Sequence, residues 1–212
     1  DSITVTTPFH LASVSKTITA TAVLRLVQEG KIKLEDSVST FLPGFPKPAI
    51  TIKLLLNHRS GLPNYVHYME RLGWDKKRRI TNQDVLDFLI TRYNDISIAP
   101  ADRGFSYSNT NYALLALIIE KVAGIPYGAY LKQTIFDPLG MKDTYVFSLA
   151  DSARSMPSYF YSGKQYAFDF LDLVYGDKNI YSTAQDLLKF SVALSSGTFL
   201  NANLSEAALT PY

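Results

Sequence analysis

The sequence contains no cysteine. This absence excludes disulfide cross-links, a thiolate nucleophile and any zinc or iron–sulfur site built on cysteine. Histidine is scarce as well, and no two of His10, His58 and His67 have the i, i+4 spacing of a helical zinc site. The composition therefore gives no indication of a bound metal.

A surplus of charge of one sign is also lacking. The formal net charge is +2, whereas proteins that bind nucleic acid usually present a clustered basic face. The basic run from Lys76 to Arg79 is interpreted as a solvated loop. No apolar run approaches the roughly 18 residues that a membrane-spanning helix needs. We therefore expect no nucleic-acid partner and no transmembrane segment.

Apolar residues, in contrast, are plentiful enough for a large core. The chain has 212 residues, of which 47% are hydrophobic. This length predicts one large domain, or at most two small ones, and we expect a single domain over residues 1–212. No internal repeat, long linker or signal peptide is visible. Because the chain begins at Asp1 without an initiator Met, we expect a processed or excised segment.

Apolar spacing and helix-ending residues predict a mainly helical chain. There are two exceptions. The chain is predicted to be extended over residues 1–10, and loops with one or two short strands are predicted over residues 143–180. Residues 64–79 and 96–108 are predicted to be loops. Ser182 and Gln185 have the pattern of a capping box. The predicted helices are 13–29 before Gly30, 51–58 capped by Thr51, 82–91 capped by Thr81, 109–123 before Gly124, 127–136, 183–197 and 205–210.

Ser13 and Lys16 form the first chemically suggestive pair. Residues i and i+3 share one face of a helix, and a serine in the first helical turn lies where backbone N–H groups favour developing negative charge. A serine hydroxyl is a poor nucleophile that needs a neighbouring base. The pattern Ser-x-x-Lys also arises by chance about once in a chain of this length. A helix-capping serine and a solvated lysine are therefore the alternative.

The surrounding sequence resembles the penicillin-recognising serine hydrolases. FHLASVSKTITATAVLRLVQEGKIKLEDSVSTFLP is similar to their nucleophile segment, and TIKLLLNHRSGLP, FSYSNTNYALLALIIEKVAGIPYGAYLKQTIFDPLGM and GDKNIYSTAQDLLKF follow in the same order. The similarity covers nearly the whole chain and is strongest to the class C β-lactamase branch, with its D-aminopeptidases, carboxypeptidases and family VIII-type esterases. Tyr107-Ser108-Asn109 matches the second motif of that branch, Tyr-x-Asn.

The resemblance implies the α/β serine β-lactamase (DD-peptidase-like) fold. The family's third motif, Lys/His-Thr/Ser-Gly on a strand, has no convincing counterpart here, and only twelve residues precede Ser13. We therefore expect a mainly α chain, the helical half of that fold, with the central antiparallel sheet largely missing. The same reasoning leads us to expect truncation at both ends.

The resemblance also implies roles for four residues. Ser13 would be the nucleophile, Lys16 and Tyr107 would share acid–base work, and Asn109 would bind Lys16 and the substrate amide. The Lys16 ammonium would favour the phenolate form of Tyr107. The alternative is that Tyr107 packs in a loop and Asn109 only caps a helix. His58 is expected to be structural, below the active site.

The predicted function is that of a serine hydrolase which forms an acyl-enzyme with a β-lactam, peptide amide or ester. Its partner would be a small-molecule or peptide substrate, with no metal or organic cofactor. A periplasmic or extracytoplasmic location is expected by family resemblance, and the oligomeric state stays open. A non-catalytic binding or scaffold protein derived from the same fold is the second hypothesis, and the missing third motif favours it.

Overall fold

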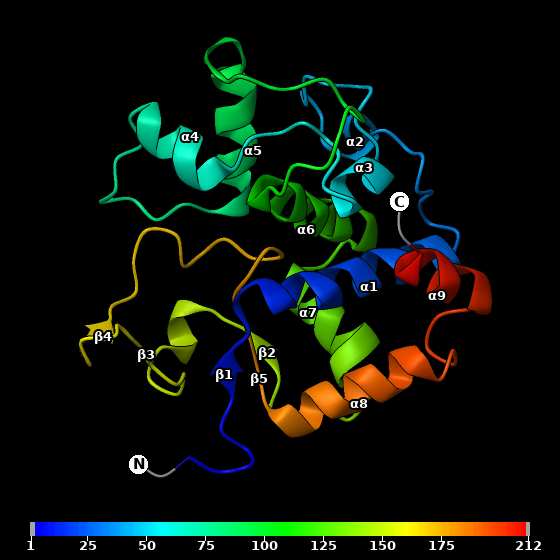
Figure 1. Cartoon of the computed structure of the whole chain (residues 1–212), viewed down its shortest axis with the longest axis vertical. Helices are drawn as coiled ribbons and strands as arrows, with labels where there is room; N and C mark the ends of the chain where they lie inside the picture. Colours follow the sequence, from blue (N-terminus) through cyan, green and yellow to red (C-terminus); the bar gives the residue numbers. More distant parts are fainter. Residues whose placement is uncertain (1–2, 211–212) are drawn as a thin grey trace.

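A computed structural model describes residues 3–210, and its centre is a helix that is apolar on every side. This helix, α6 (Asn109–Ala123), is continuously buried over residues 110–119. A helix without a polar face must be covered all round. Accordingly, α6 packs against the helices α1, α2, α3, α4, α5 and α7 (Figure 1).

The covering helices lie in two groups on either side of α6 (Figure 1). One group holds the segments from 38 to 91 and the other holds α1, α7 and α8. Short 3-10 turns cover Tyr93–Asp95 and Leu149–Asp151. The remaining helices are α1 (Ser15–Gln28), α2 (Val38–Phe41), α3 (Ile52–Leu56), α4 (Tyr65–Arg71), α5 (Asn82–Thr91), α7 (Tyr127–Leu131) with a π-helical turn at Lys132–Phe136, α8 (Ala184–Ser195) and α9 (Ala202–Leu209).

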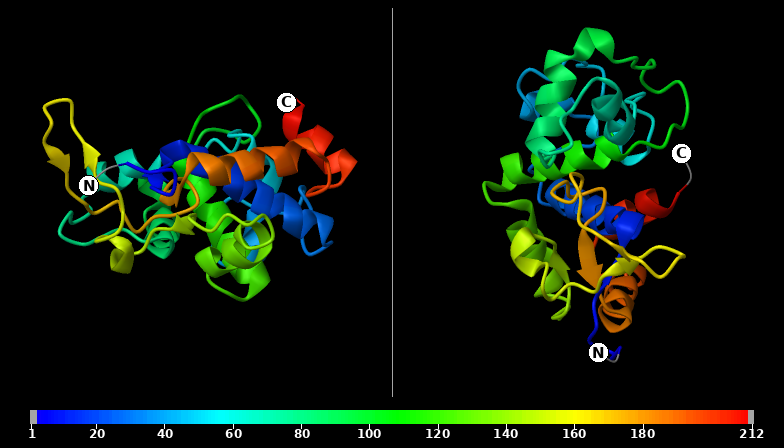
Figure 2. Two further views of the ribbon diagram at one scale, coloured as in Figure 1. Left: turned by 90° about the horizontal axis from the view of Figure 1, so that it is seen from below. Right: turned by 90° about the vertical axis from the view of Figure 1, so that its left-hand side faces the viewer.

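A small antiparallel sheet lies at one end of α1. Its order is β1 (Phe9–His10), β5 (Ile180–Ser182) and β2 (Tyr145–Val146). His10 and Tyr145 both pair with Tyr181, so the central strand β5 joins the start of the chain to residues 145–146. A separate hairpin of β3 (Ser158–Tyr159) and β4 (Gln165–Tyr166) projects from the body of the molecule (Figure 2).

The expected fold class is confirmed, because helices dominate and the sheet is small. Thr51 and Thr81 cap α3 and α5 as predicted, and Thr81 forms a capping box with Asp84. Gly124 ends α6 with a φ of 71°, which a glycine adopts at no steric cost.

Three local predictions are wrong. Residues 64–79 contain helix α4, whose Tyr65, Tyr68 and Met69 are buried at helical spacing. The cap of α8 is Thr183, which accepts from Asp186 N–H at 3.2 Å, and no capping box forms at Ser182. Residues 143–180 hold more short strands than expected, because the projecting hairpin has little apolar patterning.

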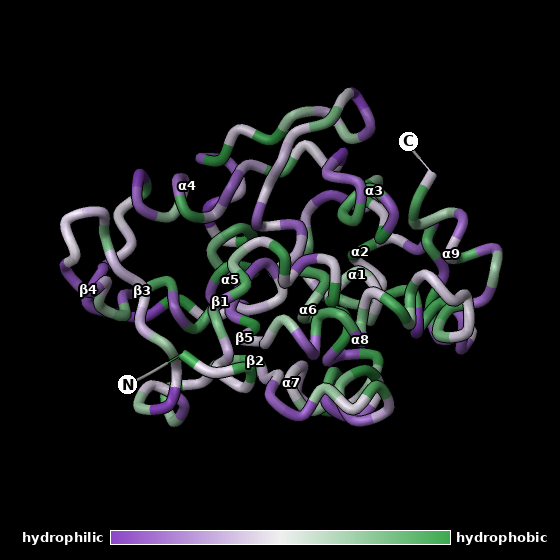
Figure 3. Tube along the Cα trace, turned by 60° about the horizontal axis from the view of Figure 1, so that its bottom comes forward, coloured by the Kyte–Doolittle hydropathy of each residue, from purple (hydrophilic) through white to green (hydrophobic). Residues whose placement is uncertain are grey.

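The hydrophobic core is formed mainly by side chains of the helices. Hydrophobic stretches concentrate in the middle of the molecule, and the outer loops are more hydrophilic (Figure 3). Ile18, Leu26 and Leu55 are among the fully buried side chains. Among residues 3–210 no single helix is long and apolar enough to span a membrane, and the one pair that passes by length and composition, α6 with Tyr127–Phe136, is bent by 75°.

Candidate active site

Ser13 lies in a 3-10 turn, Ala12–Val14, directly before α1, and not in the first turn of the α-helix as predicted. The preceding Ala12 has a φ of 46°, in the left-handed region that a residue with a Cβ rarely adopts. Leu11 N–H donates to Ile180 O at 2.9 Å, which ties the turn to β5. The tied, strained turn leaves the Ser13 side chain exposed at the protein surface.

Lys16 lies one turn further on, and its side chain is only 6% exposed. Its ammonium donates to Ser13 Oγ at 3.2 Å and to the main-chain oxygen of Asp177 at 2.7 Å. The i, i+3 spacing therefore brings Ser13 and Lys16 together. Lys16 is not a solvated lysine, as the alternative interpretation had it.

Tyr107 reaches the same serine from the loop before α6. Its hydroxyl donates to Ser13 Oγ at 2.8 Å, and the Lys16 ammonium lies 5.0 Å from the centroid of its ring. Tyr107 is 47% exposed, so its hydroxyl is held at the surface next to Ser13. The side chains of Lys16 and Tyr107 thus meet at the oxygen atom of Ser13, the arrangement that the family resemblance implied.

Asn109 is the first residue of α6, and it does not cap the helix. The capping position belongs to Ser108, whose side chain makes no capping hydrogen bond. The Oδ1 atom of Asn109 is buried and finds no hydrogen-bond partner among residues 3–210. A buried acceptor without a partner costs free energy. The expected hydrogen bond between Asn109 and Lys16 does not form within residues 3–210, because the Lys16 ammonium donates to Ser13 Oγ and to Asp177 O instead.

His58 supports the Tyr107 loop from below. It has a φ of 54°, and its Nδ1 accepts from Ser108 N–H at 3.2 Å. Its ring lies 4.5 Å from the Tyr107 ring, centroid to centroid. Burial, followed by the charge of Lys16, lowers the pKa of His58 to about 4. A neutral imidazole therefore packs against Tyr107 at neutral pH.

The loop 172–179 carries the oxygen that binds Lys16, and three elements hold it. Gly176 has a φ of 92°, and a Cβ there would lie 2.5 Å from Tyr112 O of α6. Thr19 Oγ1 of α1 donates to Gly176 O at 2.7 Å, and Asn82 Nδ2 of α5 donates to Tyr175 O at 2.8 Å. The position of Asp177 is therefore fixed by helices α1, α5 and α6.

Asp177 is a charged residue of this site that the sequence did not reveal. It is 1% exposed, and its Oδ2 accepts from the Tyr65 hydroxyl at 3.1 Å. Burial raises the pKa of Asp177 to about 6, against the lowering influence of Lys178, Lys16 and the Tyr65 hydrogen bond. The motif patterns gave no signal for it, because the Lys16 contact joins residues 161 positions apart.

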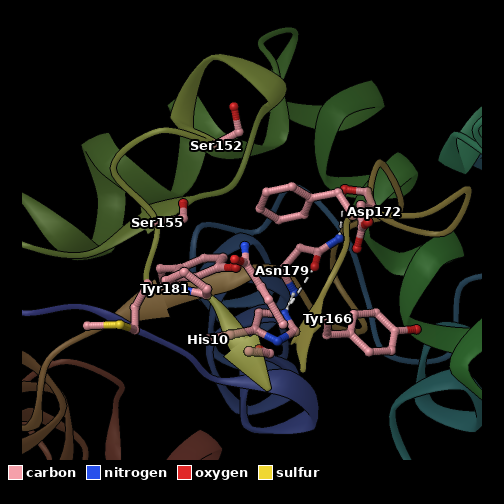
Figure 4. Close-up of a pocket in the computed structure, with 12 residues that line it drawn as sticks. His10, Ser152, Ser155, Tyr166, Asp172, Asn179 and Tyr181 are labelled. Atoms are coloured by element: carbon pink, nitrogen blue, oxygen red, sulfur yellow. Dashed lines mark hydrogen bonds between the residues drawn. The ribbon is translucent and has the colours of Figure 1, made fainter. Parts of the chain in front are cut away.

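A pocket of about 270 Å³ is lined in part by Asp172 and Asn179 of this loop (Figure 4). Asn179 closes the loop by donating from Nδ2 to Asp172 O at 3.0 Å, and its Oδ1 lies 3.0 Å from His10 Nε2. Burial lowers the pKa of His10. Ser13, Lys16 and Tyr107 are not among the pocket's lining residues, which include His10, Ser152, Ser155, Tyr166, Asp172, Asn179 and Tyr181.

Metal ligands do not gather anywhere in the described part of the chain: no three His, Asp or Glu side chains between residues 3 and 210 lie close enough to hold an ion. His67, the third histidine, lies on α4 and takes no part in the arrangement around Ser13. What the site offers is one exposed hydroxyl between an ammonium and a phenol.

Several known proteins are similar to this chain in sequence and in fold. A penicillin-binding protein of Bacillus subtilis is 36% identical over 222 residues, which cover 96% of this chain and 48% of that protein. The penicillin binding protein from Bacillus halodurans superposes with a TM-score of 0.82 at 28% identity, over 99% of this chain and 65% of that chain. The chain thus spans about half the length of the curated relative it matches.

A third similar protein is the D-amino acid amidase from Ochrobactrum anthropi SV3, whose structure complexed with L-phenylalanine superposes with a TM-score of 0.79. It is 31% identical, over 96% of this chain and 59% of that chain. The family model described as Beta-lactamase matches residues 1–211. The chain therefore belongs to the beta-lactamase family, within the superfamily of serine β-lactamases and penicillin-binding proteins.

Proposed function

We propose that the protein is a serine hydrolase of the class C β-lactamase and penicillin-binding-protein type, which works through an acyl-enzyme on Ser13. The observation that carries this proposal is the meeting of Lys16 Nζ and Tyr107 Oη at Ser13 Oγ, at 3.2 Å and 2.8 Å. A serine nucleophile needs a base within hydrogen-bond reach. Both neighbours satisfy that geometric requirement.

In the structure the Tyr107 hydroxyl carries a proton that it donates to Ser13 Oγ, and in the proposed acylation that proton is first released to solvent. The Ser13 oxygen then attacks the substrate carbonyl while its own proton passes to the Tyr107 phenolate. The Lys16 ammonium donates to Ser13 Oγ at 3.2 Å and so orients the attacking oxygen. The new C–O bond creates a tetrahedral oxyanion, to which the Ser13 N–H donates. As the oxyanion collapses, the bond to the leaving group breaks and Tyr107 returns the proton to that group. Water then hydrolyses the ester and regenerates Ser13.

Asn109 is the proposed contact for a substrate amide. Its buried Oδ1 has no partner among residues 3–210 and lies at the start of α6, two residues after Tyr107. A substrate amide N–H would supply the missing donor, which a substrate ester cannot do. The family relatives named above include an amidase, and the substrate proposed here is a β-lactam, a peptide amide or an ester.

The experiment that tests this function compares matched substrates. We expect a D-amino acid p-nitroanilide and the corresponding p-nitrophenyl ester both to acylate the gene product, and Ser13→Ala to abolish both reactions. Asn109→Ala should slow the anilide about tenfold more than the ester, because only the anilide loses a hydrogen bond of about 1.4 kcal/mol. Equal slowing of both substrates would contradict the role of Asn109, and activity retained in Ser13→Ala would contradict the function.

A further inference from the structure

The hairpin β3–β4 projects from the body of the molecule (Figure 2) and carries a dense group of exposed aromatic side chains. Every residue from 158 to 168 is exposed. Contiguous exposed apolar surface marks a site of contact with a protein partner or a membrane. The hairpin is therefore a candidate interaction surface. Its exposed aromatic residues are Tyr159, Phe160, Tyr161, Tyr166 and Phe168.

The hairpin is anchored at its base and ordered at its turn. The Phe168 ring stacks on the ring of the buried Phe147, with 4.9 Å between the centroids. At the turn, Phe160 N–H donates to Lys164 O and Gly163 N–H donates to Phe160 O, both at 2.9 Å. The outer end of the hairpin is therefore a defined structure that is held away from the hydrophobic core.

The charges along this hairpin are all positive. No Asp or Glu occurs from residue 152 to residue 168, and Lys164 lies exposed in the turn. Tyrosine rings collect at the headgroup level of membranes and phenylalanine rings enter the boundary below it, while a lysine at the surface is attracted by anionic lipids. Sugar hydroxyls would need several amide or carboxylate partners, and Gln165 is the only such side chain between residues 158 and 168. The combination fits a lipid surface better than a glycan.

We propose that the outer end of the hairpin, residues 159–164, inserts into the headgroup region of a lipid membrane with a negatively charged surface. Phe160 and Tyr161 enter the interface with their rings, and Lys164 pairs with the lipid phosphates. The hairpin does not span the membrane and binds it reversibly, because only a few side chains leave water. This inference goes beyond the proposed function, since it concerns where the protein is held and not the reaction at Ser13.

The test measures sedimentation of the gene product with vesicles of phosphatidylcholine, with or without phosphatidylglycerol. Phe160→Ser and Tyr161→Ser should each weaken binding to the anionic vesicles about tenfold, because one ring no longer leaves water. Lys164→Gln should weaken binding to the anionic vesicles about fivefold and leave binding to pure phosphatidylcholine unchanged. Leu188→Ser is the matched control, because Leu188 is an equally exposed apolar residue on α8, and its binding should equal that of the wild type.

A second readout reports the depth of the hairpin directly. Phe160→Trp places a tryptophan at the outer end, and brominated lipids should quench its emission more than that of the wild type, whose single tryptophan is Trp74. Absence of vesicle binding by the wild type, an equal loss in Leu188→Ser, or no excess quenching in Phe160→Trp overturns the inference. Sedimentation with an insoluble glycan in place of vesicles, or self-association that requires Tyr161, overturns it as well.

Discussion

The hydroxyl of Tyr107 lies 2.8 Å from Oγ of Ser13, although 94 positions separate the two residues in the sequence. The contact exists because α6 lies against α1, and Tyr107 and Ser13 directly precede these two helices. His58 packs against the Tyr107 ring and binds the following N–H, so the hydroxyl is held from behind. The phenol of Tyr107 is thus held within hydrogen-bond reach of an exposed serine.

Tyr107→Phe removes the phenolic oxygen and keeps the ring that packs on His58. Loss of a positioned acid or base costs about 10²–10⁴ in rate, so we expect acylation of Ser13 to fall by that order. The free energy of unfolding should stay within about 1 kcal/mol of the wild type, because the substitution is nearly isosteric. Stopped-flow acylation and urea titration provide the two measurements. A wild-type rate in Tyr107→Phe would show that Tyr107 is not the base.

Lys16→Ala should reduce acylation at least as much as Tyr107→Phe, since it removes the ammonium that touches Ser13 Oγ. Groups that act as one unit give strongly non-additive losses. The double variant should therefore be little slower than the slower single variant. Losses that simply multiply in the double variant would instead mean that Lys16 and Tyr107 work independently.

Features that depend on residues close together in the sequence could be predicted from it, whereas contacts between distant segments could not. Helices 82–91 and 109–123 follow from local apolar spacing and are confirmed. The proximity of Ser13 and Lys16 follows from one helical turn. Asp177 could not be inferred, because its burial and its contact with Lys16 depend on how α1, α4 and α6 pack around one loop.

Helix α4 was missed for a different reason. Its buried positions are Tyr65, Tyr68 and Met69, and tyrosines next to charged residues resemble a polar loop when only the sequence is read. Only the packed structure shows that Tyr65 N–H donates to Thr110 Oγ1 at 2.8 Å and that its hydroxyl reaches Asp177. A tyrosine can be buried like an apolar residue when its hydroxyl finds a hydrogen-bond partner inside the protein. Such partners are visible only in the folded structure.

Gly176→Ala tests the loop that presents Asp177. The added Cβ would lie 2.5 Å from Tyr112 O and 2.7 Å from Ala116 Cβ, and φ is 92°. Backbone strain and overlap with a packed helix together should cost at least about 3 kcal/mol of unfolding free energy. Gly197→Ala is the matched control, with a φ of 66° and no atom within 4 Å of the added Cβ. Gly197→Ala should lower the free energy of unfolding by about 1–2 kcal/mol, the cost of a left-handed backbone alone. An equal loss of unfolding free energy in both variants would mean that close packing of Gly176 is unimportant.

His58→Asn isolates the titration of the imidazole, and asparagine tolerates the left-handed backbone that this position requires. His58 has a folded-state pKa of about 4 against 6.5 in the unfolded chain, so the unfolded state binds more protons between these values. Stability contributed by neutral His58 is therefore complete above pH 6.5 and is lost as pH falls toward 4. The wild type should lose up to about 3 kcal/mol more than His58→Asn over this range. Parallel pH profiles of unfolding free energy for the two proteins would refute the buried neutral state of His58.

The central claim is that Ser13 is the nucleophile, and covalent labelling tests it most directly. The gene product is incubated with benzylpenicillin and, separately, with a fluorophosphonate, then digested and mapped by peptide mass spectrometry. We predict an adduct on Ser13 with both reagents, a much slower adduct in Lys16→Ala, and none in Ser13→Ala. Labelling of Ser15 or Ser60 with Ser13 unmodified would contradict the account.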